Sequence, residues 1–175
     1  QTNCAKRFAG SAFAEAMQMP VATTFKGKGL IADNHPCAAG VLGRSGTPIA
    51  SWFMNECDLI LALGTSFSNH TGIASYKPTI QVDYDRMQLG KFHAVDLPVW
   101  SEIGQFVAAA KAAMPASRAS GDQRPEIAER WRIWREEKAS RAADDLGNGV
   151  NAAAIFTALT RTCLLYTSPS PRDGT

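Results

Sequence analysis

The most constraining feature of this chain is an unbroken apolar run, Leu59 to Leu63, that stops at Gly64. A short run with no polar residue is typical of a central strand in a parallel sheet, because helices cover both faces of such a strand. A second run of this kind begins at Thr79 and ends at Asp83. The chain therefore requires a layered fold in which parallel strands are buried between helices.

Helical and extended patterns alternate at short intervals along the first 115 residues. Apolar periodicity predicts helices over 5–16, from Pro48 after a capping Thr47, and over 102–114. Strands are expected at 20–25, 58–64, 79–83 and within 94–99. The Gly-, Pro-, Asp- and Asn-rich stretch 29–46 is predicted to be irregular, and the link 64–79 shows no clear helix. The alternation predicts an α/β fold with a doubly wound, mostly parallel, Rossmann-like sheet.

Composition narrows the functional classes. The 175 residues carry 18 Lys+Arg against 16 Asp+Glu, a net charge of +2, and 45% of them are hydrophobic. These values exclude a disordered chain and a polybasic nucleic-acid binder, and no apolar run is long enough to cross a bilayer. The four cysteines form no CxxC pair. This usage suits a reducing compartment, so we expect a cytoplasmic protein.

The pattern along the chain predicts several parts. We expect a nucleotide-binding type of domain over 1–115, a linker and connecting helix over 116–146, and the start of a further domain over 147–162. The helix predicted at the start has no capping residue before it, and this segment does not have the pattern of a signal peptide. We therefore expect the chain to begin inside an element. Residues 163–175 resemble a translated sequencing adapter, so we expect them to be a disordered artefact and exclude them from the fold.

The ends of the two apolar strands carry the strongest functional signal. Gly64, Thr65 and Ser66 follow the first strand, and Asp83 closes the next one 19 residues later. In doubly wound sheets a glycine turn at this edge admits phosphate, and an acid about 20 residues on accepts the ribose hydroxyls. The full G-x-G-x-x-G is absent, which leaves open that Gly64 serves only a turn and Asp83 only a cap.

A second candidate anion site is the stretch Gly43 to Thr47, just before a predicted helix N-terminus. Arg44 could pair with a phosphate, and Lys26 and Lys28 could add positive charge. The three histidines do not share ligand spacing, and no paired carboxylates or Ser/His/Asp set stands out. Cys57 has the pattern of a small core residue. We therefore predict no catalytic and no metal-binding residue in this chain, which binds rather than catalyses.

Four segments together resemble the central domain of the thiamine-diphosphate-dependent enzymes of the pyruvate oxidase, quinone-linked pyruvate dehydrogenase and acetolactate synthase group. The segments are Pro20–Gly29, Gly40–Thr47, Ala62–Phe67, and Ile80–Asp85 with Gly90 and Val95–Pro98. Their order and spacing match over about residues 5 to 114. Residues 147–162 look like the start of the thiamine-diphosphate-binding domain of this family.

The resemblance implies a flavin site in this domain. Members that carry FAD hold it across the carboxyl edge of the sheet. The residues that would contact FAD are Val41, Leu42, Gly43 and Arg44, then Gly64, Thr65, Ser66, Phe67 and Ser68, and finally Asp83 at the adenosine ribose. Thr24 and Phe25 are weaker candidates. Thiamine diphosphate and Mg²⁺ would be bound by parts of the parent enzyme outside this chain, so we expect the chain alone to be inactive.

The resemblance also implies a substrate class, pyruvate or another 2-oxo acid. Acetolactate synthases tend to carry an Arg-Phe-Asp-Asp-Arg run after the strand glycine, and Ser66 to His70 stand there in this chain. The Gly-Thr-x-Phe form is closer to pyruvate oxidases and dehydrogenases, which makes that activity the preferred prediction. The alternatives are an acetolactate synthase-like carboligase and a non-catalytic nucleotide-binding or assembly module. The parent enzyme is expected to be a homodimer or homotetramer.

Overall fold

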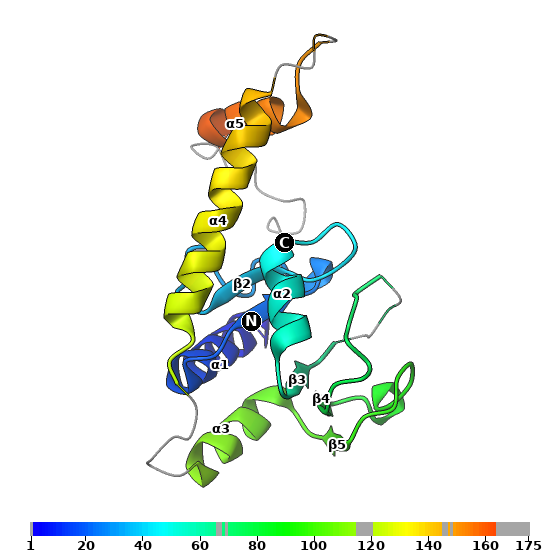
Figure 1. Cartoon of the computed structure of the whole chain (residues 1–175). Helices are drawn as coiled ribbons and strands as arrows, with labels where there is room; N and C mark the ends of the chain where they lie inside the picture. Colours follow the sequence, from blue (N-terminus) through cyan, green and yellow to red (C-terminus); the bar gives the residue numbers. More distant parts are fainter. Residues whose placement is uncertain are drawn as a thin grey trace. The chain divides into compact units, whose positions relative to one another are not determined.

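The computed structural model describes residues 2–65, 68, 70–114, 121–144, 147 and 149–163, and it describes the side chains of those between 10 and 159. Figure 1 shows the elements along the chain. In order they are α1 (Thr2–Met17), β1 (Val21–Thr23), η1 (Phe25–Gly27), β2 (Ala38–Val41), α2 (Pro48–Glu56), β3 (Ile60–Leu63), β4 (Thr79–Asp83), η2 (Arg86–Gln88), β5 (Leu97–Trp100), α3 (Ile103–Ala113), α4 (Arg124–Ala143) and α5 (Ala152–Cys163). The chain divides into two compact units, residues 1–130 and 131–175, which we describe separately.

The strands of the first unit form two sheets, and every described pairing is parallel. β1 pairs with β2, with one register shift between Val21 and Ala22. The second sheet has the order β3-β4-β5, and its register aligns Ile60 with Thr79 and Ile80 with Leu97. Helices alternate with these strands, so the predicted α/β class with a parallel sheet is confirmed.

The strand β2 lies inside the stretch 29–46, where we predicted irregular structure, so that prediction was wrong for four residues. Its sequence Ala-Ala-Gly-Val has a β-branched residue only at Val41, and turn-forming residues flank it on both sides. All four residues are buried, which shows that burial against the helices, rather than local propensity, makes this segment a strand. The last strand, expected within 94–99, is β5, which begins inside that range at Leu97 and ends one residue beyond it.

Side-chain caps begin two of the helices. Thr47 precedes α2, its side chain accepts a hydrogen bond from Ala50 N at 3.4 Å, and Pro48 occupies the first turn. This is the cap that the sequence predicts. Glu102 caps α3 by accepting from Gln105 N at 3.0 Å. The described residues between β3 and β4 contain no helix, in agreement with the prediction for that link.

The apolar core of the first unit contains separate clusters, one beside each of the two sheets. One cluster joins Ala14 of α1 to Ile31, Cys37 and Ala38 beside β2. Another joins Ile60 and Ala62 of β3 to Ala74, with Met54, Cys57 and Ile73 packed against it. Burial raises the pKa of both the Cys37 and Cys57 thiols, so both stay protonated at neutral pH. Both cysteines are therefore packing residues, as the sequence predicts for Cys57.

The beginning of α4 packs on the first unit. Ile127 is only 1% exposed, and the Arg130 guanidinium carbon lies 3.9 Å from the centroid of the Trp52 ring on α2. This distance is that of a close cation–π contact. The backbone of Gln123 also donates to Gln18 O at 3.1 Å. These contacts were not evident in the sequence, where the charged pattern of the helix dominates.

The second unit consists of the rest of α4 and the helix α5. Ion pairs between residues four apart line α4, among them Arg132 with Glu136 at 2.6 Å and Arg141 with Glu137. Asn151 begins α5, where its side chain accepts from Ala153 N at 2.8 Å. Within the part of the chain that the structure describes, no helix has both the length and the apolar character needed to cross a membrane.

Candidate functional site

The site predicted from the sequence lies where the parallel strands of the first unit end. β1 ends at Thr23, and the next residue, Thr24, caps the short helix η1 by accepting a hydrogen bond from Gly27 N at 3.2 Å. β3 ends before Gly64, and β4 ends at Asp83. Parallel strands that end together present their last residues along one edge, which is where ligands bind in folds of this class.

The turn after β3 is built around Gly64. Its φ of +61° lies in the left-handed region, and its backbone N–H donates to Val82 O at 2.9 Å. A Cβ added at this position would lie 2.9 Å from Ile103 Cδ1, so a side chain here would press on α3. Both observations explain why glycine stands here. Thr65 follows Gly64, and Ser66 and Phe67 lie outside the described residues.

Thr65 contributes a polar group without a partner. Among the side chains that the structure describes, only its Oγ1 is a buried oxygen or nitrogen that makes no hydrogen bond. Such a group costs about 1–3 kcal/mol when it is left unsatisfied, so its presence calls for an explanation. A bound ligand that donates or accepts a hydrogen bond at this position would provide one.

Asp83 places a carboxylate beside this turn. The residue is 6% exposed, and its Oδ1 accepts a hydrogen bond from Asp85 N at 2.9 Å. Its Oδ2 makes no hydrogen bond within the described part of the chain. The Asp83 carboxylate therefore caps a turn, which is the role that the sequence analysis left open as the alternative to ribose binding. Its second oxygen can still accept a hydrogen bond from a hydroxyl group.

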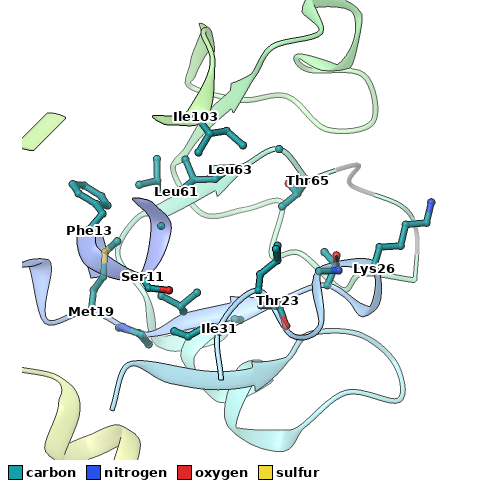
Figure 2. A pocket seen from close by; sticks show the side chains of 18 of the residues that line it. Ser11, Phe13, Met19, Thr23, Lys26, Ile31, Leu61, Leu63, Thr65 and Ile103 are labelled. Atoms are coloured by element: carbon teal, nitrogen blue, oxygen red, sulfur yellow. Dashed lines mark hydrogen bonds between the residues drawn. The ribbon is translucent and has the colours of Figure 1, made fainter. Parts of the chain in front are cut away.

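One cavity of about 510 Å³ brings these residues together, and Figure 2 shows its lining. Gly64, Thr65 and Asp83 line it together with Thr24 and Lys26. The residues that the sequence placed on the two neighbouring strand ends thus share a cavity of the size that small-molecule sites have. We call the part lined by these five residues the polar mouth.

The remainder of the cavity is apolar and runs between the two sheets, and we call it the apolar body. Its lining comes from α1, β1, β3 and their neighbours, and includes Phe13, Met19, Val21, Ile31, Leu61, Leu63 and Ile103. The α1 contribution was not predicted from the sequence. Gly10 and Ser11, two small residues in the middle of that helix, also line the cavity and were the available signal.

The stretch Val41 to Arg44 does not line this cavity but lies next to it. Leu42 N donates to Thr23 O at 2.8 Å, and Arg44 N donates to His70 O at 3.3 Å. The loops after β2 and β3 therefore meet, a contact that the sequence did not reveal. These two amides already have protein acceptors, and Thr47 N likewise donates to Val41 O at 2.8 Å. Several backbone N–H groups of this candidate anion site thus hold the loop itself together, while the Arg44 side chain stays exposed.

Other polar residues have structural roles. His35 Nε2 lies 2.8 Å from Glu15 Oε1, and its Nδ1 accepts from Cys37 N at 3.1 Å. Ser68 and Thr71 share a hydrogen bond of 2.9 Å between their hydroxyls. No group of three or more His, Cys, Asp or Glu among the described residues could hold a metal ion.

Comparison with known proteins identifies the domain type. The family model of the thiamine pyrophosphate enzyme central domain matches residues 8–110. The chain is 37% identical over 91 residues to the "Probable acetolactate synthase large subunit" of Methanocaldococcus jannaschii, covering 49% of this chain and 15% of that protein. It is 40% identical over 83 residues to the "Putative thiamine pyrophosphate-containing protein YdaP" of Bacillus subtilis, covering 47% of this chain and 14% of that protein.

A third relative extends the match. The chain is 33% identical over 114 residues to the "Putative acetolactate synthase large subunit IlvB2" of Mycobacterium tuberculosis, covering 59% of this chain and 20% of that protein. The chain thus spans a fifth or less of these relatives. Because the family model covers more than half of the chain, this chain belongs to the thiamine pyrophosphate enzymes and carries their central domain.

Proposed function

We propose that this chain is the nucleotide-holding part of a thiamine-dependent enzyme that joins 2-oxo acid units, with a reaction of the acetolactate synthase type. The named relatives favour this alternative over the pyruvate oxidase-like activity that the Gly-Thr-x-Phe form indicates. That form rests on Gly64 to Phe67, of which Ser66 and Phe67 lie outside the described residues. Sequence similarity over 90 residues or more is a broader basis for the proposal than four positions.

One observation supports the cofactor-holding role: Gly64, Thr65 and Asp83 line the same polar mouth at the carboxyl edge. A dinucleotide such as FAD needs a close backbone approach at its phosphates and a carboxylate at its ribose hydroxyls. The tight Gly64 turn, the buried unpartnered Thr65 hydroxyl and the available Asp83 Oδ2 fit these needs. We propose that these three residues hold FAD, with Thr24 and Ser66 to Ser68 forming the rest of the site and Val41 to Arg44 bordering it.

The described residues contribute binding and placement to the activity of the parent enzyme. Thiamine diphosphate, when bound with Mg²⁺ elsewhere in the parent, supplies the carbanion chemistry that 2-oxo acid conversion needs. We propose that the described residues alone are inactive, because the groups expected to bind thiamine diphosphate and Mg²⁺ belong to other parts of the parent enzyme. In this proposal the described residues hold the nucleotide at the carboxyl edge of the sheet.

The first test measures FAD retained by the full-length parent enzyme, from the visible absorbance of the purified protein. The substitution Asp83→Asn should weaken FAD binding by about tenfold or more, because one charge-assisted hydrogen bond is lost. Asp85→Asn is the matched control: Asp85 lies on the same loop but caps η2 through Met87 N at 2.9 Å, and it should leave FAD binding unchanged. A parent that is colourless and indifferent to added FAD would remove the flavin from the proposal.

The reaction type is tested separately by the products formed from pyruvate. Carbon–carbon joining with release of carbon dioxide supports the acetolactate synthase type. Reduction of an added electron acceptor without a joined product supports the pyruvate oxidase or dehydrogenase type. A full-length protein that does neither would leave the non-catalytic nucleotide-binding module as the function. Because this assay reads products, its result is independent of whether Asp83 binds FAD.

A further inference from the structure

A polar side chain lies inside the second sheet. Gln81 stands in the middle of β4, between Ile80 and Val82, and β4 itself lies between β3 and β5. Its exposed fraction is 0%, and it does not line the cavity. A buried amide group is costly unless it finds hydrogen-bond partners, so a glutamine at this position requires an explanation.

The amide of Gln81 holds the loop that follows its own strand. Its Nε2 donates to Gln88 O at 3.0 Å, and its Oε1 accepts from Gly90 N at 2.8 Å. The φ of Gly90 is +67°, in the left-handed region that glycine adopts most easily. Both ends of the Gln81 amide are thus used, and both partners belong to the end of the segment 84–90, which we call the β4 loop.

The β4 loop is also hydrogen-bonded within itself. It contains η2, and Asp85 caps this short helix by accepting from Met87 N at 2.9 Å through its Oδ1. The backbone N–H of Gln88 donates to Asp85 O at 3.0 Å. Because the beginning and the end of the loop are bonded to each other, a contact that fixes Gln88 also fixes Asp85.

The beginning of the β4 loop orients the carboxylate of the proposed nucleotide site. Asp85 N donates to Asp83 Oδ1 at 2.9 Å. Asp83 and Gln81 are two residues apart on one strand, so their side chains lie on the same face of the sheet. The loop therefore folds over this face, bonded to Asp83 at its beginning and to Gln81 at its end.

Contacts from β5 hold the backbone at this point but not the carboxylate. Ser101 N donates to Asp83 O at 3.1 Å, and Trp100 Nε1 donates to Tyr84 O at 2.9 Å. Among the residues that the structure describes, only the Asp85 amide bonds the Asp83 carboxylate. The direction of the second carboxylate oxygen, Oδ2, thus depends on where the β4 loop places that amide.

We propose that Gln81 is a positioning residue of the nucleotide site: it fixes the β4 loop, and the Asp85 amide of this loop turns Asp83 Oδ2 toward the ribose. The inference rests on the proposed role of Asp83 and goes beyond it, because it assigns a buried residue that does not line the cavity. Asp85 acts here through its backbone amide and its capping oxygen, both of which remain in the Asp85→Asn control.

FAD affinity of the full-length parent enzyme gives the first measurement. Gln81→Met keeps the length of the side chain, removes both of its hydrogen bonds and should weaken FAD binding by about tenfold. In an Asp83→Ala background the same change should weaken it by less than about twofold, because no carboxylate is left to orient. A full additional loss in that background overturns the inference, since it indicates a general structural effect.

Thr79→Val is the matched control on the same strand. Thr79 is 3% exposed, and its hydroxyl donates to Lys77 O at 3.0 Å, away from the β4 loop. This variant should lower stability and leave FAD affinity unchanged. If Asp83→Ala weakens FAD binding and Gln81→Met does not, the inference is overturned and the proposed function stands. If Asp83→Ala has no effect, the proposed role of Asp83 is refuted together with the inference.

Amide hydrogen exchange without FAD tests the connection through the loop. In Gln81→Met, the Asp85 and Gly90 amides should both exchange at least about tenfold faster than in the parent, whereas Thr79→Val should leave both unchanged. Faster exchange at Gly90 alone overturns the inference, because the loop then does not transmit the change to Asp85.

The unaltered parent enzyme provides a test if Gln81→Met does not fold. Coupling between two sites is reciprocal, so FAD bound at Asp83 should stabilise the far end of the loop. FAD should slow exchange at the Asp85 and Gly90 amides by at least about tenfold more than at the Thr79 amide, which donates to Asp96 Oδ2. Protection of Asp85 without protection of Gly90 overturns the inference.

Discussion

The turns that follow β2 and β3 contain the same residue types and differ in what their polar groups do. Each brings a threonine together with a glycine of positive φ: Thr47 after β2 packs on Gly40 within that strand, and Thr65 follows Gly64 directly after β3. The Thr47 hydroxyl lies 3.2 Å from Ala39 O and accepts from Ala50 N, whereas the Thr65 hydroxyl is buried without a partner. The threonine hydroxyl of the first turn is therefore fully used within the protein. The threonine hydroxyl of the second turn has no partner, and its residue lines the cavity.

The two turns show how a turn that supports a site differs from a turn that binds a ligand. Composition does not distinguish them, because glycine and threonine serve both. Hydrogen-bond satisfaction does, since a turn that uses its own polar groups has none to offer a ligand. By this criterion the turn after β2 supports the site, and the turn after β3 with Asp83 forms it. Substitutions of the same kind at corresponding positions of the two turns test this assignment.

The largest expected effect comes from Gly40→Ala, at the β2 glycine on which Thr47 of the following turn packs. The φ of Gly40 is +87°, and an added Cβ would lie 2.3 Å from Thr47 Oγ1 and 2.9 Å from its Cγ2. Thr47 cannot move away because its hydroxyl is held by the strand and the helix. We expect unfolding free energy to fall by about 3–5 kcal/mol, at the upper end for single substitutions. Urea denaturation measures it.

Gly72→Ala is the control, at a glycine further along the link between β3 and β4. Gly72 has a similar φ of +69°, and an added Cβ would meet no atom within 4 Å. The free energy of unfolding should therefore fall only by the cost of holding an alanine in the left-handed backbone region, about 1–2 kcal/mol. The difference between the two variants isolates the contact with Thr47. Equal losses would show that the turn after β2 is not tightly closed.

The turn after β3 is easier to predict from the sequence than the turn after β2, for a physical reason. Leu59 to Leu63 and the strand that ends at Asp83 are recognisable because buried parallel strands are continuously apolar, and their ends fix the site. The short β2 strand is stabilised by burial rather than by its own residues, so no local pattern predicts it. The backbone contact between Arg44 and His70 joins residues 26 apart and involves no side chain, so the sequence carries no signal for it.

The cavity shows a different limit of sequence reasoning. The pattern predicted one doubly wound sheet, and the described strands form two, with unpaired edges on either side of the apolar body. Apart from β2, the strands lie where the patterns predict them, but pairing depends on which strand lies beside which, and alternation along a sequence does not encode that. The α1 lining was missed because Gly10 and Ser11 resemble ordinary helix residues, and only the packing of α1 gives them a role.

A smaller loss is expected for Thr47→Val. The substitution keeps the shape of the side chain and removes the hydroxyl that caps α2 and bonds the strand carbonyl. Losing the cap should lower the free energy of unfolding by about 1–2 kcal/mol. Thr47→Ser retains the hydroxyl and should lose less than about 0.5 kcal/mol. If both variants lose the same amount, methyl packing rather than hydrogen bonding holds this turn.

The smallest effect on stability is expected for the same substitution in the turn after β3, Thr65→Val. Its hydroxyl is buried without a partner, so replacing it by a methyl group removes a desolvation penalty rather than a hydrogen bond. The free energy of unfolding should stay constant or rise by up to about 1 kcal/mol, opposite in sign to Thr47→Val. In the full-length enzyme the same variant should weaken FAD binding, whereas Thr65→Ser should preserve it. A Thr65→Val chain as destabilised as the Thr47→Val chain would mean that the hydroxyl already has a partner within the protein, and the two turns would then differ only in sequence.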